Sequence, residues 1–131
     1  MAKYVYPAIF TQEAGGYSIR FPDFDSCYTS AQTLEEGMEM ANDVLCLTLY
    51  GLEEDGGTIP AASPIKTVQA GEAEFVTLVS CDTIEYRKFY DNKAVKKTLT
   101  IPAWLNTMAE RQGVNFSMTL QSALKQELNI Q

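Results

Sequence analysis

The chain has 131 residues, of which 46% are hydrophobic and 21% are charged, and it carries a formal net charge of −7. This apolar content supports a compact core and excludes a disordered chain, and no apolar run approaches the roughly 18 residues that span a bilayer. The first seven residues lack the apolar segment of a signal peptide, so we expect a cytoplasmic protein.

The N-terminal part predicts three strands. Residues 4–10 are aromatic and β-branched, and Pro7 predicts that this strand lies at a sheet edge or is bulged there. A Gly-containing turn at residues 14–16 leads into residues 17–21, where apolar and polar side chains alternate, so the two segments form a hairpin. After a further turn, residues 27–29 form a short third strand.

A helix of about 20 residues follows. Thr33 and Glu36 fit a capping box, with Thr33 as the N-cap. Apolar residues then recur at spacings of three and four, which predicts one buried face. This stripe comprises Leu34, Met38, Ala41, Leu45, Leu49 and Leu52. The helix ends in the acidic and glycine-rich residues 53–57.

The next part predicts a loop, a strand and a connecting segment. Residues 58–71 have no periodicity, and residues 74–80 form a fourth strand, apolar enough to lie inside a sheet. Residues 82–92 are polar with aromatic interruptions, which predicts a short helix or a tether. The element order predicts an α+β unit in which one helix packs on one face of a small sheet.

The C-terminal part predicts a strand and two helices. Residues 95–101 alternate as a strand, Pro102 suits the first turn of a helix, and Gly113 suits its end. Asn115 caps a second helix. A lone strand leaves its backbone groups unpaired and two short helices cannot bury their apolar stripes, so this segment needs a second copy of itself. We therefore predict a homodimer.

Charge divides the chain at the same place. Residues 1–92 hold 15 acidic and 5 basic side chains, a balance of −10, whereas residues 93–131 hold 2 acidic and 5 basic ones, a balance of +3. The two segments are therefore predicted to have different partners.

Two antiparallel copies of the 95–101 strand would present polar side chains to the DNA major groove, which admits such a ribbon. The start of the second helix would offer backbone N–H groups to a phosphate. The predicted DNA-binding residues are Lys96, Thr98, Thr100, Lys93, Asn115, Phe116 and Ser117, and Lys97 and Arg111 add non-specific attraction. The alternative is a dimerisation module whose polar face is merely solvated.

Two resemblances to known families carry this further. Residues 95–102 and 113–117 resemble the ribbon–helix–helix repressors. The body resembles the HicB antitoxin family in the stretches 21–27, 33–36, 51–56 with 59–60, and 89–95. One departure is that Asp25 and Ser26 stand where that family usually has Pro-Gly before the cysteine.

The resemblance implies a toxin-binding body at residues 1–80 with a partial ribonuclease-H-like fold, a tether at 81–92, and a ribbon–helix–helix domain at 93–131 that binds DNA and dimerises. It implies a type II antitoxin that neutralises a HicA-type, mRNA-cleaving toxin and represses its own operon by binding operator DNA. The assembly would be a homodimer through the C-terminal domain or a dimer of dimers. The body residues expected to contact the toxin are Asp23, Asp25, Tyr28, Glu35 and Glu36.

Two other functions stay open at this point. One is a metal-dependent nuclease, which needs carboxylates that converge on two metal ions, although no spacing here forces that convergence. The other is a stand-alone transcription regulator whose body senses a small ligand. We expect no enzyme, cofactor or metal site, and three buried free thiols: Cys27, Cys46 and Cys81. The chain has no histidine, so imidazole catalysis is excluded.

Overall fold

The computed structural model describes residues 2–131, and the chain divides into two compact units, Met1–Lys93 and Ala94–Gln131. Each unit has its own helices. Among the described residues, no helix is both long enough and apolar enough to cross a membrane.

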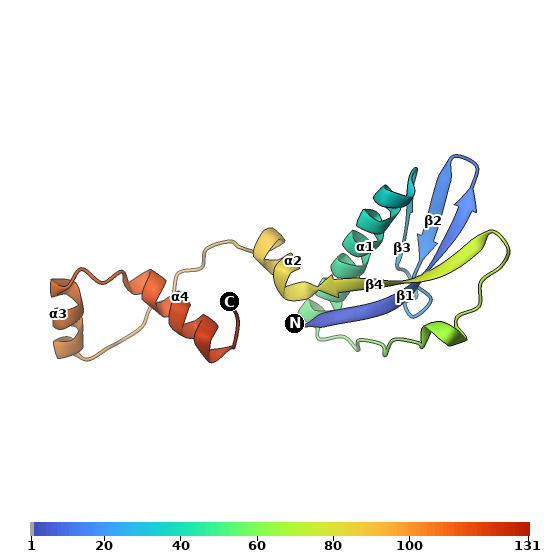
Figure 1. Cartoon of the computed structure of the whole chain (residues 1–131). Coiled ribbons are helices and arrows are strands. Elements are labelled where there is room, and N and C mark those ends of the chain that lie inside the picture. Colours follow the sequence, from blue (N-terminus) through green and yellow to red (C-terminus); the bar gives the residue numbers. More distant parts are fainter. Residues whose placement is uncertain (1) are drawn as a thin grey trace. The chain divides into compact units, whose positions relative to one another are not determined.

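The first unit contains a four-stranded antiparallel sheet. Its strands are β1 (Lys3–Glu13), β2 (Gly16–Arg20), β3 (Tyr28–Ala31) and β4 (Glu74–Asp82), and their order in the sheet is β3-β2-β1-β4 (Figure 1). The three predicted N-terminal strands, the hairpin and the fourth strand are therefore confirmed.

Two predicted positions within the sheet are wrong. β1 is an interior strand, although Pro7 predicted an edge. Because β2 pairs with β1 only from Ile9 onward, Pro7 has a single neighbour, Leu78 of β4, so the missing N–H is tolerated there. β4, expected inside the sheet, is an edge strand, and its Phe75 and Leu78 are 40% and 49% exposed.

The helix α1 (Leu34–Asp55) begins and ends where the sequence predicts. The Thr33 side chain accepts a hydrogen bond from the Glu36 backbone N–H at 3.1 Å. Glu36 returns a bond to the N–H of Gln32 rather than of Thr33, at 3.4 Å, so the capping box is shifted by one residue. Gly56 ends the helix with φ at 66°, a left-handed conformation that glycine adopts without strain.

The core lies between α1 and one face of the sheet (Figure 1). The predicted stripe is only partly buried, because Leu34 and Met38 in the first turns are 44% and 40% exposed. Gly37 lies against the sheet instead. A Cβ there would stand 3.0 Å from the Phe10 ring, so the lack of a side chain allows the helix to approach β1 closely. The buried members of the core are Tyr6, Ala8, Phe10, Ile19, Phe21, Cys27, Ala41, Leu45, Cys46, Leu49, Val79 and Cys81.

The loop between α1 and β4 contains a single 3₁₀ turn, η1 (Ile65–Thr67). Side chains of the sheet unit hold this loop in place. Asp23 accepts hydrogen bonds from the backbone N–H of Ser63, at 2.9 Å, and from its hydroxyl. The Tyr6 hydroxyl donates to the carbonyl oxygen of Pro60.

Residues 81–92 do not form a free tether. β4 extends to Asp82, whose side chain caps the helix α2 (Thr83–Tyr90) by accepting from the N–H groups of Ile84 and Glu85. This helix packs on α1, and the first unit therefore extends to Lys93.

The second unit consists of α3 (Ala103–Arg111) and α4 (Phe116–Glu127). Gly113 has φ at 67°, and the Asn115 side chain accepts from the Met118 N–H at 3.0 Å, so both local signals are confirmed. Residues 95–101, predicted as a strand, form no strand here. A β-strand exists only beside a neighbour, and no other segment within the described residues 2–131 pairs with them.

Candidate binding surfaces

The residues predicted for toxin contact lie at two ends of β3. Asp23 and Asp25 belong to the turn before it, and Glu35 and Glu36 belong to the first turn of α1 after it. A four-residue strand spans about 13 Å, so the two acidic pairs do not form one cluster. Tyr28, at the start of β3, is 70% exposed.

These residues differ in their exposure and in the hydrogen bonds that they already make within the chain. Asp25 and Glu35 are exposed and have no hydrogen-bond partner among the described residues, whereas Asp23 is half-buried and bonded to Ser63. Glu36 is exposed and bonded to the Gln32 backbone. Asp23 therefore has a structural role, since it holds the loop that follows α1.

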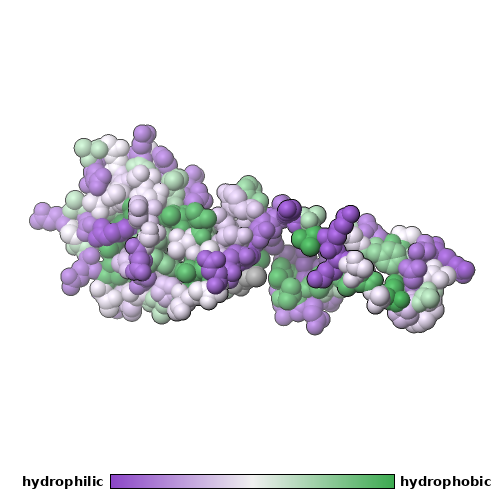
Figure 2. Space-filling model, turned by 180° about the vertical axis from the view of Figure 1, so that it is seen from behind, coloured by the Kyte–Doolittle hydropathy of each residue, from purple (hydrophilic) through white to green (hydrophobic). Residues whose placement is uncertain are grey.

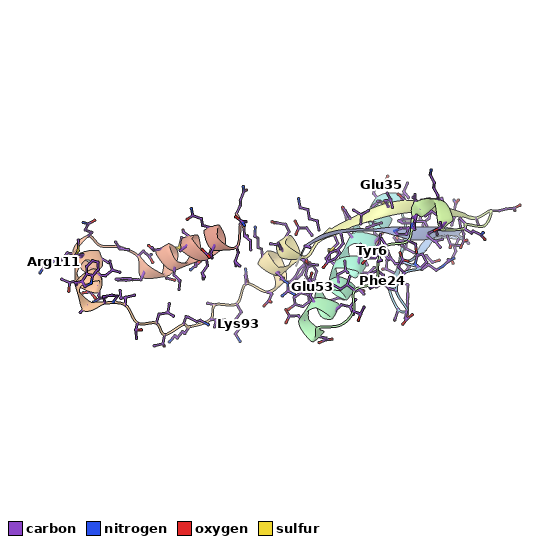
Figure 3. The ribbon with its side chains drawn as sticks, turned by 90° about the horizontal axis from the view of Figure 1, so that it is seen from below. Tyr6, Phe24, Glu35, Glu53, Lys93 and Arg111 are labelled. Atoms are coloured by element: carbon purple, nitrogen blue, oxygen red, sulfur yellow. The ribbon has the colours of Figure 1, made fainter. Side chains whose placement is uncertain are left out.

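An acidic face runs along α1 away from the core. Glu35, Glu39 and Asp43 are spaced four residues apart, and all three are exposed. Figure 3 shows Glu35 and Glu53 at opposite ends of the helix. The two residues are 18 positions apart, which corresponds to about 27 Å of helix, so the two ends form separate surfaces.

At the C-terminal end of α1, Glu53 is the centre of a polar network. Its Oε2 accepts from the hydroxyls of Tyr4, at 2.9 Å, and Thr83, at 2.8 Å. Its Oε1 lies 3.1 Å from Nη2 of Arg87. The side chains of Glu53 and Arg87 are only 5% and 14% exposed. The network therefore joins α1, β1 and α2 at one point.

Two pKa shifts follow from this network. Burial alone would raise the pKa of Glu53, but hydrogen bonds from partners that include Thr83, Tyr4 and Arg87 outweigh it and hold the pKa at about 2. Burial, together with the adjacent Glu53 carboxylate, raises the pKa of Tyr4 to about 12. Glu53 is therefore ionised and Tyr4 protonated at neutral pH.

Aromatic rings surround the junction of α1 and α2. Arg87 stacks over the Tyr50 ring, with its guanidinium carbon 4.6 Å from the ring centroid. The ring of Tyr50 lies 5.5 Å from that of Tyr86, and the ring of Tyr86 lies 4.6 Å from that of Tyr90. Phe89 and Tyr90 are 75% and 64% exposed.

The three cysteines are buried and free, as predicted. Burial raises the pKa of each thiol, so none is an activated nucleophile. Within residues 2–131, no three Cys, Asp or Glu side chains come together in a way that could hold a metal ion.

The residues predicted for DNA contact are all exposed in the second unit or immediately before it. Lys93, Lys96, Thr98 and Thr100 lie in the extended segment that precedes α3. The Asn115 side chain caps α4, and Ser117 accepts from the Gln121 amide at 3.2 Å. The structure therefore places the two predicted groups on different elements, the extended segment and the start of α4.

The second unit buries almost nothing by itself. Within residues 94–131, all of which are described, no side chain is buried, and Figure 2 shows hydrophobic groups at its surface. Trp104 is 65% exposed and Leu99 is 59% exposed. Eleven large apolar side chains are exposed: Val95, Leu99, Ile101, Trp104, Leu105, Met108, Val114, Phe116, Met118, Leu124 and Leu128.

Sequence reasoning missed the α1–α2 junction. Glu53 and Arg87 are 34 residues apart, and neither belongs to a periodic pattern that would pair them. The aromatic residues of 86–90 were the available signal, because a polar helix with several aromatic rings needs an apolar neighbour for some of them.

Comparison with known proteins identifies the relatives of this chain. A family model described as "HicB_like antitoxin of bacterial toxin-antitoxin system" matches residues 6–124. An uncharacterized 14.9 kDa protein from the rep-hol intergenic region of Haemophilus phage HP1 (strain HP1c1) is 30% identical over 104 residues, which are 77% of this chain and 75% of the phage protein.

Two further relatives have informative names. "Antitoxin HicB 1" of Photorhabdus laumondii is 40% identical over 53 residues, which are 40% of this chain and 34% of that protein. A chain of a solved toxin–antitoxin complex from Streptococcus pneumoniae has a TM-score of 0.61 and 28% identity, and the match covers 95% of this chain and 99% of that one.

Proposed function

The chain belongs to the HicB-like antitoxin family of bacterial toxin–antitoxin systems, and from this we propose that its first unit neutralises a small HicA-type toxin while its second unit represses the operon that encodes both proteins. As an antitoxin it is a regulatory, non-enzymatic protein. Both proposed activities are binding reactions, and both belong to the cytoplasm, where operator DNA and messenger RNA are found.

The acidic first unit supports toxin binding. A toxin that cleaves messenger RNA needs a basic surface to hold the phosphate backbone, and an acidic protein can cover that surface. Asp25, Tyr28, Glu35 and Glu36 are exposed and available for contact. Asp23 would act indirectly, by fixing the loop at Ser63.

The exposed apolar side chains of the second unit support dimerisation. Thirty-eight residues with no buried side chain cannot form a stable core alone. We propose that two copies pair their 95–101 segments as an antiparallel ribbon and bury their α3 and α4 faces together. A dimer, or a dimer of dimers, would result.

Such a ribbon would bind operator DNA. Alternation along the paired strand would place Lys96, Thr98 and Thr100 on the face opposite Val95, Leu99 and Ile101. These three polar side chains would enter the major groove. Lys93 and the start of α4, at Asn115, Phe116 and Ser117, would contact phosphates and fix the register.

The observation behind this proposal is that one antitoxin chain contains two different units. The first is acidic and has a buried core, and the second is basic and has no buried core. Co-expression tests it. A toxin encoded beside this chain should arrest growth when expressed alone, and full-length chain should restore growth and purify with the toxin. The complex should retard a DNA fragment from its own promoter. A toxin that still arrests growth in the presence of this chain would refute the antitoxin pairing.

A further inference from the structure

A groove of about 320 Å³ lies where α1, the end of β4 and α2 meet. Its lining includes Asp43 of α1, Asp82 at the end of β4, and three residues of α2: Glu85, Tyr86 and Tyr90. It lies apart from the turn and helix start that sequence analysis selected for toxin contact.

The walls of this groove are held rigidly. The Asn42 amide donates to the Ser80 carbonyl oxygen at 2.6 Å, which joins α1 to the edge of β4. Asp82 caps α2, and the pair of Glu53 and Arg87 fixes the same helix against α1. A ligand would therefore find the groove already formed, with little ordering to be done on binding.

Aromatic surface is exposed at the mouth. Tyr90 lies 4.6 Å from Tyr86 and 4.8 Å from Phe89, measured between ring centroids, and most of Phe89 and Tyr90 faces solvent. Tyrosine and other large amphipathic rings at a rigid concave site are typical anchors of protein interfaces.

The charge around these rings favours a cation. Asp43 is an exposed carboxylate, Asp82 caps α2, and Glu85 already pairs with Lys88 of the same helix. The exposed carboxylates Glu35 and Glu39 continue the negative face along α1. Nucleic acid would be repelled by such a surface, whereas a basic protein would be attracted. Tyrosine faces beside carboxylates suit an arginine, which stacks on rings and bonds carboxylates at the same time.

The chain itself already holds one arginine of α2 between an aromatic ring and carboxylates. Arg87 stacks on Tyr50 while it pairs with Glu53 and Glu54. We infer that the groove between α1 and α2 receives a cationic side chain, best an arginine, from a basic protein partner. This rests on the proposed function in that the partner is the toxin, and it places part of the toxin contact on α1 and α2 rather than at the start of β3.

Binding of purified toxin to the full-length chain tests the inference, with isothermal titration calorimetry as the measurement. Asp43→Lys and Tyr90→Ala should each weaken binding at least about tenfold. Glu72→Lys changes the net charge equally at an exposed site in the loop before β4, and Tyr90→Phe keeps the ring, so both should stay within about twofold of the parent. Circular dichroism of each variant should match that of the parent.

The outcomes separate the two proposals. If the parent chain binds the toxin and Asp43→Lys and Tyr90→Ala bind as tightly as their controls, the groove is not a contact and only this inference is overturned. If the parent chain does not bind the toxin, the proposed antitoxin pairing fails as well. An equal loss of affinity for Asp43→Lys and Glu72→Lys would indicate general electrostatic attraction and would also overturn the groove as a contact.

Discussion

Nη2 of Arg87 lies 3.1 Å from Oε1 of Glu53, and both side chains are almost completely removed from solvent. Arg87 belongs to α2 and Glu53 to the last turns of α1, so this pair fixes the short helix that follows the sheet. Further contacts of Arg87 with Glu54 and the Tyr50 ring give its guanidinium several partners. We therefore expect this ion pair to hold residues 83–90 against α1 as part of the first unit.

Arg87→Ala should destabilise the first unit by about 3 kcal/mol, because it removes a guanidinium that pairs with the buried Glu53 carboxylate. Lys88→Ala is the matched control. Its ion pair with Glu85 is exposed, so that loss should cost less than about 1 kcal/mol. Urea unfolding followed by circular dichroism measures both. Equal losses would show that Arg87 contributes no more than a surface charge.

The pH dependence of stability should report Glu53. Its pKa is about 2 in the folded chain against an ordinary value of 4.5, so its stabilising contribution is complete above pH 4.5 and is lost as the pH falls toward 2. The loss should reach at most about 3 kcal/mol. Glu53→Gln should be less stable at pH 7 and should show a flatter acid limb than the parent.

Glu74 provides the comparison for this acid transition. A hydrogen bond from the Gly71 N–H, followed by those from Arg20 and Thr11, holds the pKa of Glu74 at about 2. Because the pKa of Glu74 is lowered as far as that of Glu53, Glu74→Gln should flatten the acid limb by a comparable amount. The assignment to Glu53 would be wrong if thermal unfolding between pH 2 and 5 showed a flatter acid limb for Glu74→Gln but an unchanged one for Glu53→Gln.

Local signals predicted this fold better than patterns that depend on pairing. The caps at Thr33 and Asn115 and the left-handed Gly113 each depend on a few neighbouring residues, and all three are present. The position of a strand within a sheet depends on distant segments. Pro7 therefore suggested an edge in a strand that is interior overall, and the apolar β4 proved to be an edge.

The candidate surfaces divide in the same way. Charge and exposure along the chain suggested an acidic body and a basic C-terminal segment, which need no tertiary information. The groove beside α2 depends on a contact between Glu53 and Arg87, which sequence spacing does not reveal. Helical periodicity predicted that Leu34 and Met38 are buried, but both are exposed. Periodicity identifies which face of a helix is apolar, but not how much of the helix length packs against the sheet.

Leu99→Asp should convert the proposed dimer into a monomer. Leu99 is 59% exposed in the single chain, and pairing of two 95–101 segments would bury it. Leu47→Asp is the control, because Leu47 is equally exposed, at 57%, but lies on α1 of the first unit. Sedimentation at micromolar concentration should show a monomer for the first variant and a dimer for the second. Dimers in both would place the interface elsewhere.

Lys96→Ala should weaken operator binding while leaving the dimer intact. Lys96 lies on the strand face opposite Leu99, so its removal takes away a groove contact and a positive charge but no buried surface. A base contact of this kind corresponds to about tenfold or more in affinity. If the ammonium also neutralises a phosphate, the slope of log affinity against log salt should fall by about 1.

Lys125→Ala, in the last turn of α4, removes the same charge away from the proposed ribbon and should change the affinity much less. Fluorescence anisotropy with a promoter fragment at several salt concentrations measures both the affinity and its salt dependence. Equal effects of the two substitutions would mean that the chain attracts DNA through net charge alone and that the 95–101 segment does not enter the groove.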